Sequence, residues 1–263
     1  MPKEEKKFIL IAGPCVIEEE RLTFKIAQQL KEITADFPLH FIFKASFDKA
    51  NRTRLNSFRG PGLEKGLTIL KKIKDKLKIP VLSDVHCVTQ IKLAEKVLDV
   101  IQIPAFLCRQ TDLVLEAART KKTINIKKGQ FLSPYDVKYI IEKVESTHNK
   151  NILLTERGTF FGYNNLVVDF RSFGILKSFG YPVIFDVTHS LQRPSANRGV
   201  SGGERKFVVP LGRAAVSFGV DGIFCEVHPQ PQKALSDKYT SINFKTLEKL
   251  LKDIFRIRKV IRE

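Results

Sequence analysis

The chain has few cysteines and no long apolar run, and each of these shortages excludes a class of protein. Its four cysteines are widely spaced and form no CxxC pair, so neither a disulfide framework nor a zinc ribbon is indicated. The apolar run 8–17 is too short to span a bilayer, and residues 3–7 before it carry mixed charge, unlike the positive start of a signal peptide. We therefore expect a cytoplasmic protein that has no membrane partner.

Linkers are also missing from the sequence. No Pro-, Gly- or Ser-rich stretch and no change of composition divides the 263 residues. A chain of this length can form one substantial domain. The prediction is a single domain over residues 1–263.

Acidic residues are outnumbered by basic ones, 28 against 45, which gives a net charge of +17. Such a charge attracts nucleic acid or phosphorylated metabolites, and it does not by itself choose between them. Much of the excess lies in predicted helices, for example at Lys71, Lys72 and Lys76, where an exposed face is the simpler interpretation. No helix-turn-helix, zinc-finger spacing or RNP-like aromatic signature accompanies the charge, so nucleic-acid binding is a minor alternative and no nucleic-acid partner is expected.

What the sequence does contain is a regular alternation of strand-like and helix-like segments. Eight short apolar runs are typical of strands: 8–13, 41–43, 80–82, 100–103, 123–126, 152–154, 182–185 and 222–225. Helical patterns separate most of them: 18–35, 64–77, 89–98, 111–119, 134–145, 173–179, 204–218 and 244–261. This alternation implies parallel strands joined by crossovers. The length fits the about 250 residues of a closed (β/α)8 TIM barrel, which we predict; an open doubly wound sheet is the alternative.

Polar or charged residues follow these apolar runs. They are Cys15, Lys44, Lys49, Asp84, His86, Gln102, Arg109, Lys127, Arg157, His189 and Glu226. In a (β/α)8 barrel, catalytic groups lie where strands end and the following loops begin. An open sheet would normally use one crevice instead. The series therefore predicts one active site at the strand ends of a barrel.

The segment after the second strand is the most specific part of the chain. It reads KASFDKANRT at 44–53 and resembles the KxSFDKANR segment of the 3-deoxy-D-manno-octulosonate 8-phosphate synthase family. Further motifs similar to that family follow in order along essentially the whole chain: AGPC at 12–15, SDVH at 83–86, QIPAFLCRQTD at 102–112, NIKKGQF at 125–131, TERG at 155–158, FGYNNL at 161–166, FDVTHS at 185–190 and EVHP at 226–229. Coincidence does not account for so many ordered motifs.

The resemblance implies a transferase that condenses phosphoenolpyruvate with D-arabinose 5-phosphate and water. The products are inorganic phosphate and an eight-carbon sugar acid phosphate for lipopolysaccharide precursor (KDO) biosynthesis. Phosphoenolpyruvate brings a carboxylate and a phosphate, and each needs cationic or amide donors. By resemblance, Lys44, Lys49, Gln102, Lys127 and Arg157 line its site.

Asn51, Arg52 and Thr53 resemble the family's site for the phosphate of the aldose. A serine often follows the arginine in the family, and Thr53 keeps the hydroxyl. The related seven-carbon synthase, which uses erythrose 4-phosphate, typically has a KPRTS-like segment here, so KANR favours the longer aldose. Arg109 is expected, by resemblance, to reach the sugar phosphate of a neighbouring subunit, and a homotetramer is implied.

Cys15, His189, Glu226 and Asp237 match the family's metal ligands. One thiol, one imidazole and two carboxylates suit a borderline divalent transition metal such as zinc, iron or manganese. Taken alone, Cys15 would more often be a small buried residue and Asp237 a helix N-cap. Metal-dependent members carry this cysteine, whereas metal-independent members have asparagine there. The resemblance therefore implies the metal-dependent class; the other cysteines are expected to be structural.

The resemblance leaves parts of the mechanism open. The metal either orients the aldehyde and polarises its oxygen or positions a water. Asp84 and His86 are candidates for proton transfer or water placement, and a paired strand-end interaction without catalytic role is the alternative. Residues 192–203 lack an apolar period and carry Gly and Ser, so we predict a loop that acts as a mobile lid, with a disordered surface loop that has no catalytic task as the alternative.

Overall fold

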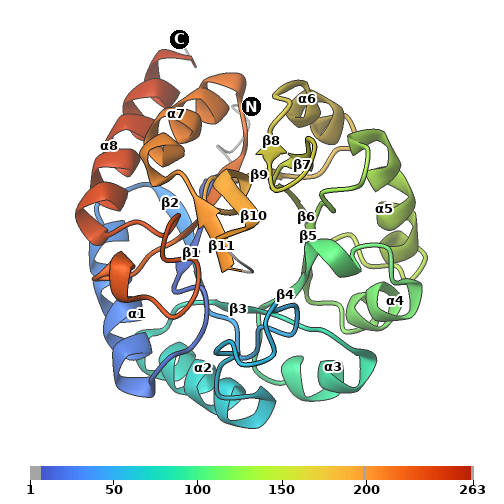
Figure 1. The fold of residues 1–263 in the computed structure, drawn as a ribbon. Helices are drawn as coiled ribbons and strands as arrows, with labels where there is room; N and C mark the ends of the chain where they lie inside the picture. Colours follow the sequence, from blue (N-terminus) through green and yellow to red (C-terminus); the bar gives the residue numbers. More distant parts are fainter. Residues whose placement is uncertain (1–6, 198–199, 262–263) are drawn as a thin grey trace.

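Eight parallel strands of the chain close into a barrel, and helices surround it (Figure 1). The structure, a computed structural model, describes residues 7–197 and 200–261. The charged residues 3–6 and positions 198 and 199 of the predicted lid therefore lie outside the described residues. Around the ring the barrel strands are β1 (Phe8–Gly13), β2 (Leu39–Lys44), β3 (Val81–Asp84), β4 (Val100–Ile103), β5 (Thr123–Lys127), β6 (Ile152–Glu156), β9 (Val183–Asp186) and β12 (Gly222–Glu226).

A helix follows each barrel strand along the chain. The helices are α1 (Glu20–Thr34), α2 (Leu63–Leu77), α3 (Val88–Ala94), α4 (Thr111–Arg119), α5 (Val137–Glu145), α6 (Arg171–Lys177), α7 (Val208–Phe218) and α8 (Phe244–Val260). The ring is closed by pairing of β1 with β12, the first and last strands of the barrel. The predicted (β/α)8 TIM barrel is confirmed.

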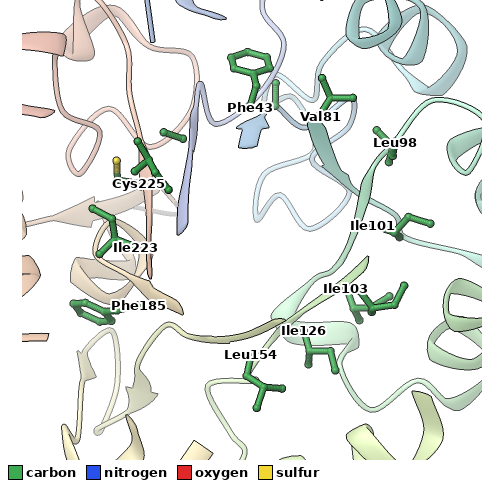
Figure 2. Packing of buried hydrophobic residues seen from close by; sticks show 14 of the residues in the cluster. Phe43, Val81, Leu98, Ile101, Ile103, Ile126, Leu154, Phe185, Ile223 and Cys225 are labelled. Atoms are coloured by element: carbon green, nitrogen blue, oxygen red, sulfur yellow. The ribbon is translucent and has the colours of Figure 1, made fainter. Parts of the chain in front are cut away.

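Each barrel strand divides its side chains between two cores, because successive residues of a strand point to opposite faces. Inside the ring, seven of the eight barrel strands each contribute one residue to a small apolar cluster: Ile11, Ile42, Leu82, Val100, Leu153, Ile184 and Phe224. Their sequence neighbours, such as Phe43, Ile101 and Phe185, surround the ring of strands and belong to the larger core beneath the helices (Figure 2). The short runs are therefore continuously apolar, as expected for strands buried on both faces.

The helices form because their apolar residues recur at intervals of three and four. In α8 the buried positions are Leu247, Leu250, Leu251 and Ile254, while the opposite face carries lysines and arginines. Asn243 caps this helix, since its side-chain oxygen accepts a hydrogen bond of 2.9 Å from the Thr246 amide. The predicted exposed face of α2 is confirmed for Lys71, Lys72 and Lys76.

Residues 192–203, predicted as a loop that acts as a lid, form a hairpin in their described part. Strand β10 (Gln192–Asn197) pairs antiparallel with β11 (Val200–Gly203). The register shifts between Arg193 and Asn197, and a bulged hairpin of this kind needs no apolar alternation. A second hairpin, β7 (Thr159–Phe160) with β8 (Leu166–Val167), was also not predicted. Within the described residues, no helix is long and apolar enough to cross a membrane.

Candidate active site

A layer of polar side chains lies above the apolar interior of the barrel. Each follows an interior residue by two positions and therefore points to the same side of its strand: Lys44 after Ile42, Asp84 after Leu82, Gln102 after Val100, Asp186 after Ile184 and Glu226 after Phe224. All five are buried. The carboxyl ends of the strands thus bring polar groups together at one mouth of the barrel, where (β/α)8 enzymes carry their active sites.

Four potential metal ligands meet at this mouth. One donor atom each from Cys15, His189, Glu226 and Asp237 lies within 4.8 Å of the others. The Cys15 Sγ is 2.8 Å from Asp237 Oδ2, and His189 Nε2 is 3.2 Å from Glu226 Oε1. Cys15 follows β1, Glu226 ends β12 and His189 follows β9, and these three strands are neighbours. A cluster predicted from scattered positions is therefore assembled by the barrel.

The electrostatics of the cluster fit a cation. Burial raises the pKa of the Cys15 thiol, and the charges of Asp237 and Glu226 raise it further. Burial opposes a charged His189, but Asp186 and Glu226 raise its pKa well above the usual value. Glu226 Oε2 is buried without a hydrogen-bond partner in the described structure. A divalent metal bound by sulfur, nitrogen and oxygen would displace the thiol proton and offset the charge of the carboxylates.

Asp186 links this cluster to Lys127. Its Oδ2 contacts Lys127 Nζ and lies 2.7 Å from His189 Nδ1, while its Oδ1 accepts a 2.9 Å bond from the His189 amide. Burial would raise the pKa of Asp186, but the charges of His189 and Lys127 hold it well below the usual range. Because the ring nitrogen Nδ1 faces a carboxylate, Nε2 is left toward the cluster, an arrangement common among metal-binding histidines.

Lys127 and Arg157 are two of the buried cations of the site. The Lys127 ammonium lies 3.3 Å from the centroid of the Phe224 ring, and burial lowers its pKa to about 8 although Asp186 opposes this. Arg157 is 6% exposed; its Nη2 donates a 2.8 Å bond to Gln192, and its Nη1 is buried without a described partner. Burial also lowers the pKa of Arg157, yet an arginine stays protonated at neutral pH.

Two further lysines lie beside the cluster. Lys44 donates from Nζ to the Cys15 carbonyl at 2.7 Å and to Glu226 Oε1 at 3.3 Å. Burial opposes the charge of Lys49, but Cys15, Asp84 and the cluster carboxylates raise its pKa. These cations offset the negative charge of the carboxylates in the mouth.

Asp84 and His86 form a pair at the end of β3. Asp84 Oδ2 lies 3.0 Å from His86 Nε2, and Asp84 Oδ1 accepts a short hydrogen bond from the Ser46 hydroxyl. A carboxylate acceptor places the ring proton of neutral His86 on Nε2. His86 Nδ1 is then an acceptor, and it is buried without a described partner.

Gln102 belongs to a chain of amides and hydroxyls across three strands. Asn125 donates a 2.9 Å bond to Gln102 Oε1, and Thr155 donates a 2.6 Å bond to Asn125 Oδ1. The carbonyl end of the Gln102 amide is therefore fixed, and its orientation in the mouth is determined by Asn125.

The predicted aldose residues lie outside this buried group. Asn51 and Thr53 are exposed in the loop between β2 and α2. Arg52 donates from Nε to the Phe58 carbonyl at 3.0 Å, and its Nη2 is buried without a described partner. Arg109 is exposed after β4. Within the described chain, these four side chains stand apart from the metal-ligand cluster.

Several residues of the site were not predicted. Asp186 and Asn125 lie on barrel strands in phase with the interior residues, and that period of two was the signal that would have found them. Gln192 follows the predicted ligand His189 by three positions and bonds both Arg157 and Asp237. Its role depends on tertiary contacts, for which the sequence has no local signal.

Of the other cysteines, which were expected to be structural, Cys108 and Cys225 are buried, but Cys87 is exposed and does not pack in the core.

Comparisons with known proteins agree on one family. The DAHP synthetase I family matches residues 3–262. Three similar proteins each bear the name 2-dehydro-3-deoxyphosphooctonate aldolase. The one from Geotalea uraniireducens is 57% identical, and the alignment covers 98% of this chain and 95% of the relative. The proteins from Desulfatibacillum aliphaticivorans (56%, covering 95% and 92%) and Fusobacterium nucleatum (53%, covering 98% and 93%) align similarly.

Proposed function

The chain belongs to the DAHP synthetase I family, and from this membership we propose that it acts as a 2-dehydro-3-deoxyphosphooctonate aldolase. It condenses phosphoenolpyruvate with D-arabinose 5-phosphate and water, and it releases inorganic phosphate and 3-deoxy-D-manno-octulosonate 8-phosphate. The observation that carries this proposal is the 53–57% identity, over nearly the full chain, to relatives that bear this one name. The buried cations of the barrel mouth support it.

Phosphoenolpyruvate binds among these cations. Lys127 at the end of β5 and Arg157 directly after the neighbouring β6 present buried positive charge, and Arg157 Nη1 still lacks a hydrogen-bond acceptor among the described residues. A phosphate or carboxylate oxygen supplies that acceptor, because a guanidinium and an anion form strong charge-assisted hydrogen bonds. Lys44, Lys49 and Gln102 complete the phosphoenolpyruvate site.

D-Arabinose 5-phosphate binds with its aldehyde near C3 of phosphoenolpyruvate and its phosphate farther out. Asn51, Arg52 and Thr53 bind that phosphate from the exposed loop after β2. This position suits a substrate that enters second, over a buried phosphoenolpyruvate. Arg109 reaches the sugar phosphate in a neighbouring subunit of a homotetramer. Phe106, three positions before Arg109, is 50% exposed, and an exposed aromatic side chain of this size supports burial of this surface between subunits.

Cys15, His189, Glu226 and Asp237 hold a divalent transition metal. When bound there, the metal supplies a Lewis acid beside the aldehyde or a water. Asp186 orients the His189 ring for this task, and Lys44 fixes Glu226 through Oε1 while Oε2 stays free of described partners. A thiol ligand must remain reduced, which is consistent with a cytoplasmic protein. The one closed barrel is consistent with a single synthase domain of residues 1–263.

The reaction forms a carbon–carbon bond without a covalent enzyme intermediate. C3 of phosphoenolpyruvate attacks the aldehyde carbon, water adds at C2, and the hemiketal phosphate loses phosphate by C–O cleavage. Lys127 and Arg157 stabilise the charge that changes on the phosphate and carboxylate as the double bond is lost. Asp84 fixes His86, whose Nδ1 is available to accept a proton or to position the attacking water.

The test is phosphate release from phosphoenolpyruvate with arabinose 5-phosphate or erythrose 4-phosphate as the acceptor. We expect turnover with the pentose phosphate that stops after chelation and returns when a divalent metal is added. Turnover that survives thorough metal removal would support the proposed synthase reaction but refute the role of the metal. Preference for erythrose 4-phosphate would make the protein a seven-carbon synthase and refute the role of Asn51, Arg52 and Thr53.

A further inference from the structure

Gln192, the first residue of the β10–β11 hairpin, bridges the two halves of the site. Its Oε1 accepts a 2.8 Å hydrogen bond from Arg157 Nη2, and its Nε2 donates a short hydrogen bond to Asp237 Oδ1. One half-buried amide thus contacts both an arginine proposed to bind phosphoenolpyruvate and a carboxylate proposed to bind metal.

The bridge needs the chemistry of an amide. A guanidinium only donates hydrogen bonds and a carboxylate only accepts them. A side chain that contacts both must accept at one atom and donate at another, and Gln is long enough to do so. Glutamate at this position would place a second negative charge beside Asp237, and lysine would repel Arg157.

The bridge also keeps two opposite charges from pairing directly. With Gln192 between them, Arg157 Nη1 remains without a described partner, and Asp237 Oδ2 points to Cys15 Sγ at 2.8 Å and lies 3.8 Å from His189 Nε2. If the amide were absent, the guanidinium and the carboxylate could move together and neutralise one another. Each would then be less available to an anion or to a metal.

We propose that Gln192 is a positioning residue that holds Arg157 available for phosphoenolpyruvate and Asp237 available for the metal. The inference rests on the proposed function. It predicts that one substitution at Gln192 weakens two different binding events, each of which is measurable without turnover. A role confined to one half of the site would weaken only one of them.

The experiment compares wild-type protein with Q192M, whose side chain has similar size but forms no amide hydrogen bonds. Metal-free protein is titrated with Co²⁺, followed by calorimetry and by the absorption of the cobalt–thiolate bond to Cys15. Metal-free protein is titrated separately with phosphoenolpyruvate and with inorganic phosphate by calorimetry. We expect Q192M to bind Co²⁺ about tenfold or more weakly, as outer-shell substitutions do. We expect it to bind phosphoenolpyruvate about tenfold more weakly, as loss of a hydrogen bond to a charged group does.

R193Q is the matched control. Arg193 is the next residue of the same strand, is exposed, and pairs with Glu204 at 3.1 Å on the surface of the hairpin. It contacts neither Arg157 nor Asp237 among the interactions described. We expect R193Q to bind both ligands as the wild type does, which separates a loosened hairpin from a lost bridge.

Three outcomes would overturn the inference: unchanged affinity for both ligands in Q192M, a change in only one of them, or equal losses in R193Q. If thermal unfolding shows that Q192M is not folded, Q192N takes its place, because its shorter amide cannot span both partners and the same two losses are expected. A wild-type protein that does not condense its proposed substrates refutes the function, while the Co²⁺ and phosphate titrations still test the bridge. If the wild type turns over and neither titration moves, the bridge alone is refuted.

Discussion

Arg157 has a buried hydrogen-bond donor without a described acceptor, and such a donor lowers the stability of the folded state. Its guanidinium is buried, one terminal nitrogen bonds Gln192, and the other has no described partner. A buried donor without an acceptor costs about 1–3 kcal/mol of folding free energy. An anion bound beside Nη1 would recover that free energy, so the fold favours an anionic ligand at this point.

We expect Arg157→Ala to lower kcat/KM for phosphoenolpyruvate by about 10²- to 10³-fold, the range seen when one donor to developing charge is removed. The substitution removes a buried, partly unsatisfied charge, so the melting temperature should not fall appreciably. The assay is initial-rate phosphate release with arabinose 5-phosphate in excess. Near-normal turnover in a folded variant would rule out Arg157 as a substrate-binding residue.

Asp186 supports two other groups at once, because its carboxylate contacts both Lys127 and His189. In Asp186→Asn the buried Lys127 loses its counter-charge, and leaving one charge of a buried pair unpaired typically costs about 3–5 kcal/mol. The pKa of Lys127, already about 8, should fall further. We expect the unfolding free energy in urea to drop by that amount and turnover to fall with it.

Asp75→Asn is the control for this substitution, since Asp75 pairs with Lys71 on the exposed face of α2. Exposed pairs of this kind contribute little to stability, and no measurable change is expected. An Asp186→Asn protein as stable as the Asp75→Asn protein would show that Lys127 and His189 do not depend on the carboxylate.

At the scale of elements, β1 and β2 approach so closely that one position admits only glycine. A Cβ on Gly13 would lie 1.9 Å from the carbonyl oxygen of Lys44. That carbonyl belongs to the last residue of β2, and Cys15 follows Gly13 by two positions. The glycine therefore allows the two strand ends to bring Lys44 and Cys15 into the same mouth.

Gly13→Ala should destabilise the barrel and also weaken activity, because backbone must move at the point where Lys44 and Cys15 are placed. We expect a loss of about 2–4 kcal/mol, in the upper range for single substitutions. Gly174→Ala is the matched control: in α6 its Cβ would meet Phe218 only at 3.8 Å. Alanine favours a helix over glycine by up to about 1 kcal/mol, so this variant should melt higher. Thermal unfolding of both variants compares the two sites directly, and equal melting temperatures would contradict the steric argument.

The elements differ in how far the sequence predicts them. The barrel strands were recognisable because burial on both faces makes them continuously apolar, and β1, β4 and α4 match their predicted bounds. The β10–β11 hairpin was not recognisable, since Arg193, Pro194 and Ser195 show no alternation and its register is bulged. Within the site, the ligand cluster followed from the family motifs, but Gln192 did not, because its contacts join residues 35 and 45 positions away.

At the scale of the whole molecule, the candidate metal cluster lies where the barrel closes. The first barrel strand, β1, pairs with the last, β12, which pairs with β9, and the cluster takes one residue from the end of each of them. Asp237 adds the loop before α8. A metal at this point would join segments from both ends of the chain, so its binding should stabilise the entire barrel and not only the site.

Removal of metal should therefore lower the melting temperature of the wild-type protein, and added Co²⁺ or Mn²⁺ should raise it again. A ligand that binds only the folded state stabilises it by about 2.7 kcal/mol at a free concentration of 100 times Kd. In Cys15→Ser the shift should largely disappear, because a hydroxyl is a far poorer ligand than a thiolate for such a metal. Cys87→Ser is the control, since Cys87 is an exposed free cysteine outside the cluster, and it should respond to metal as the wild type does. Equal metal responses in the two cysteine variants would refute the assignment of Cys15 and, with it, the idea that a metal joins the two ends of the barrel.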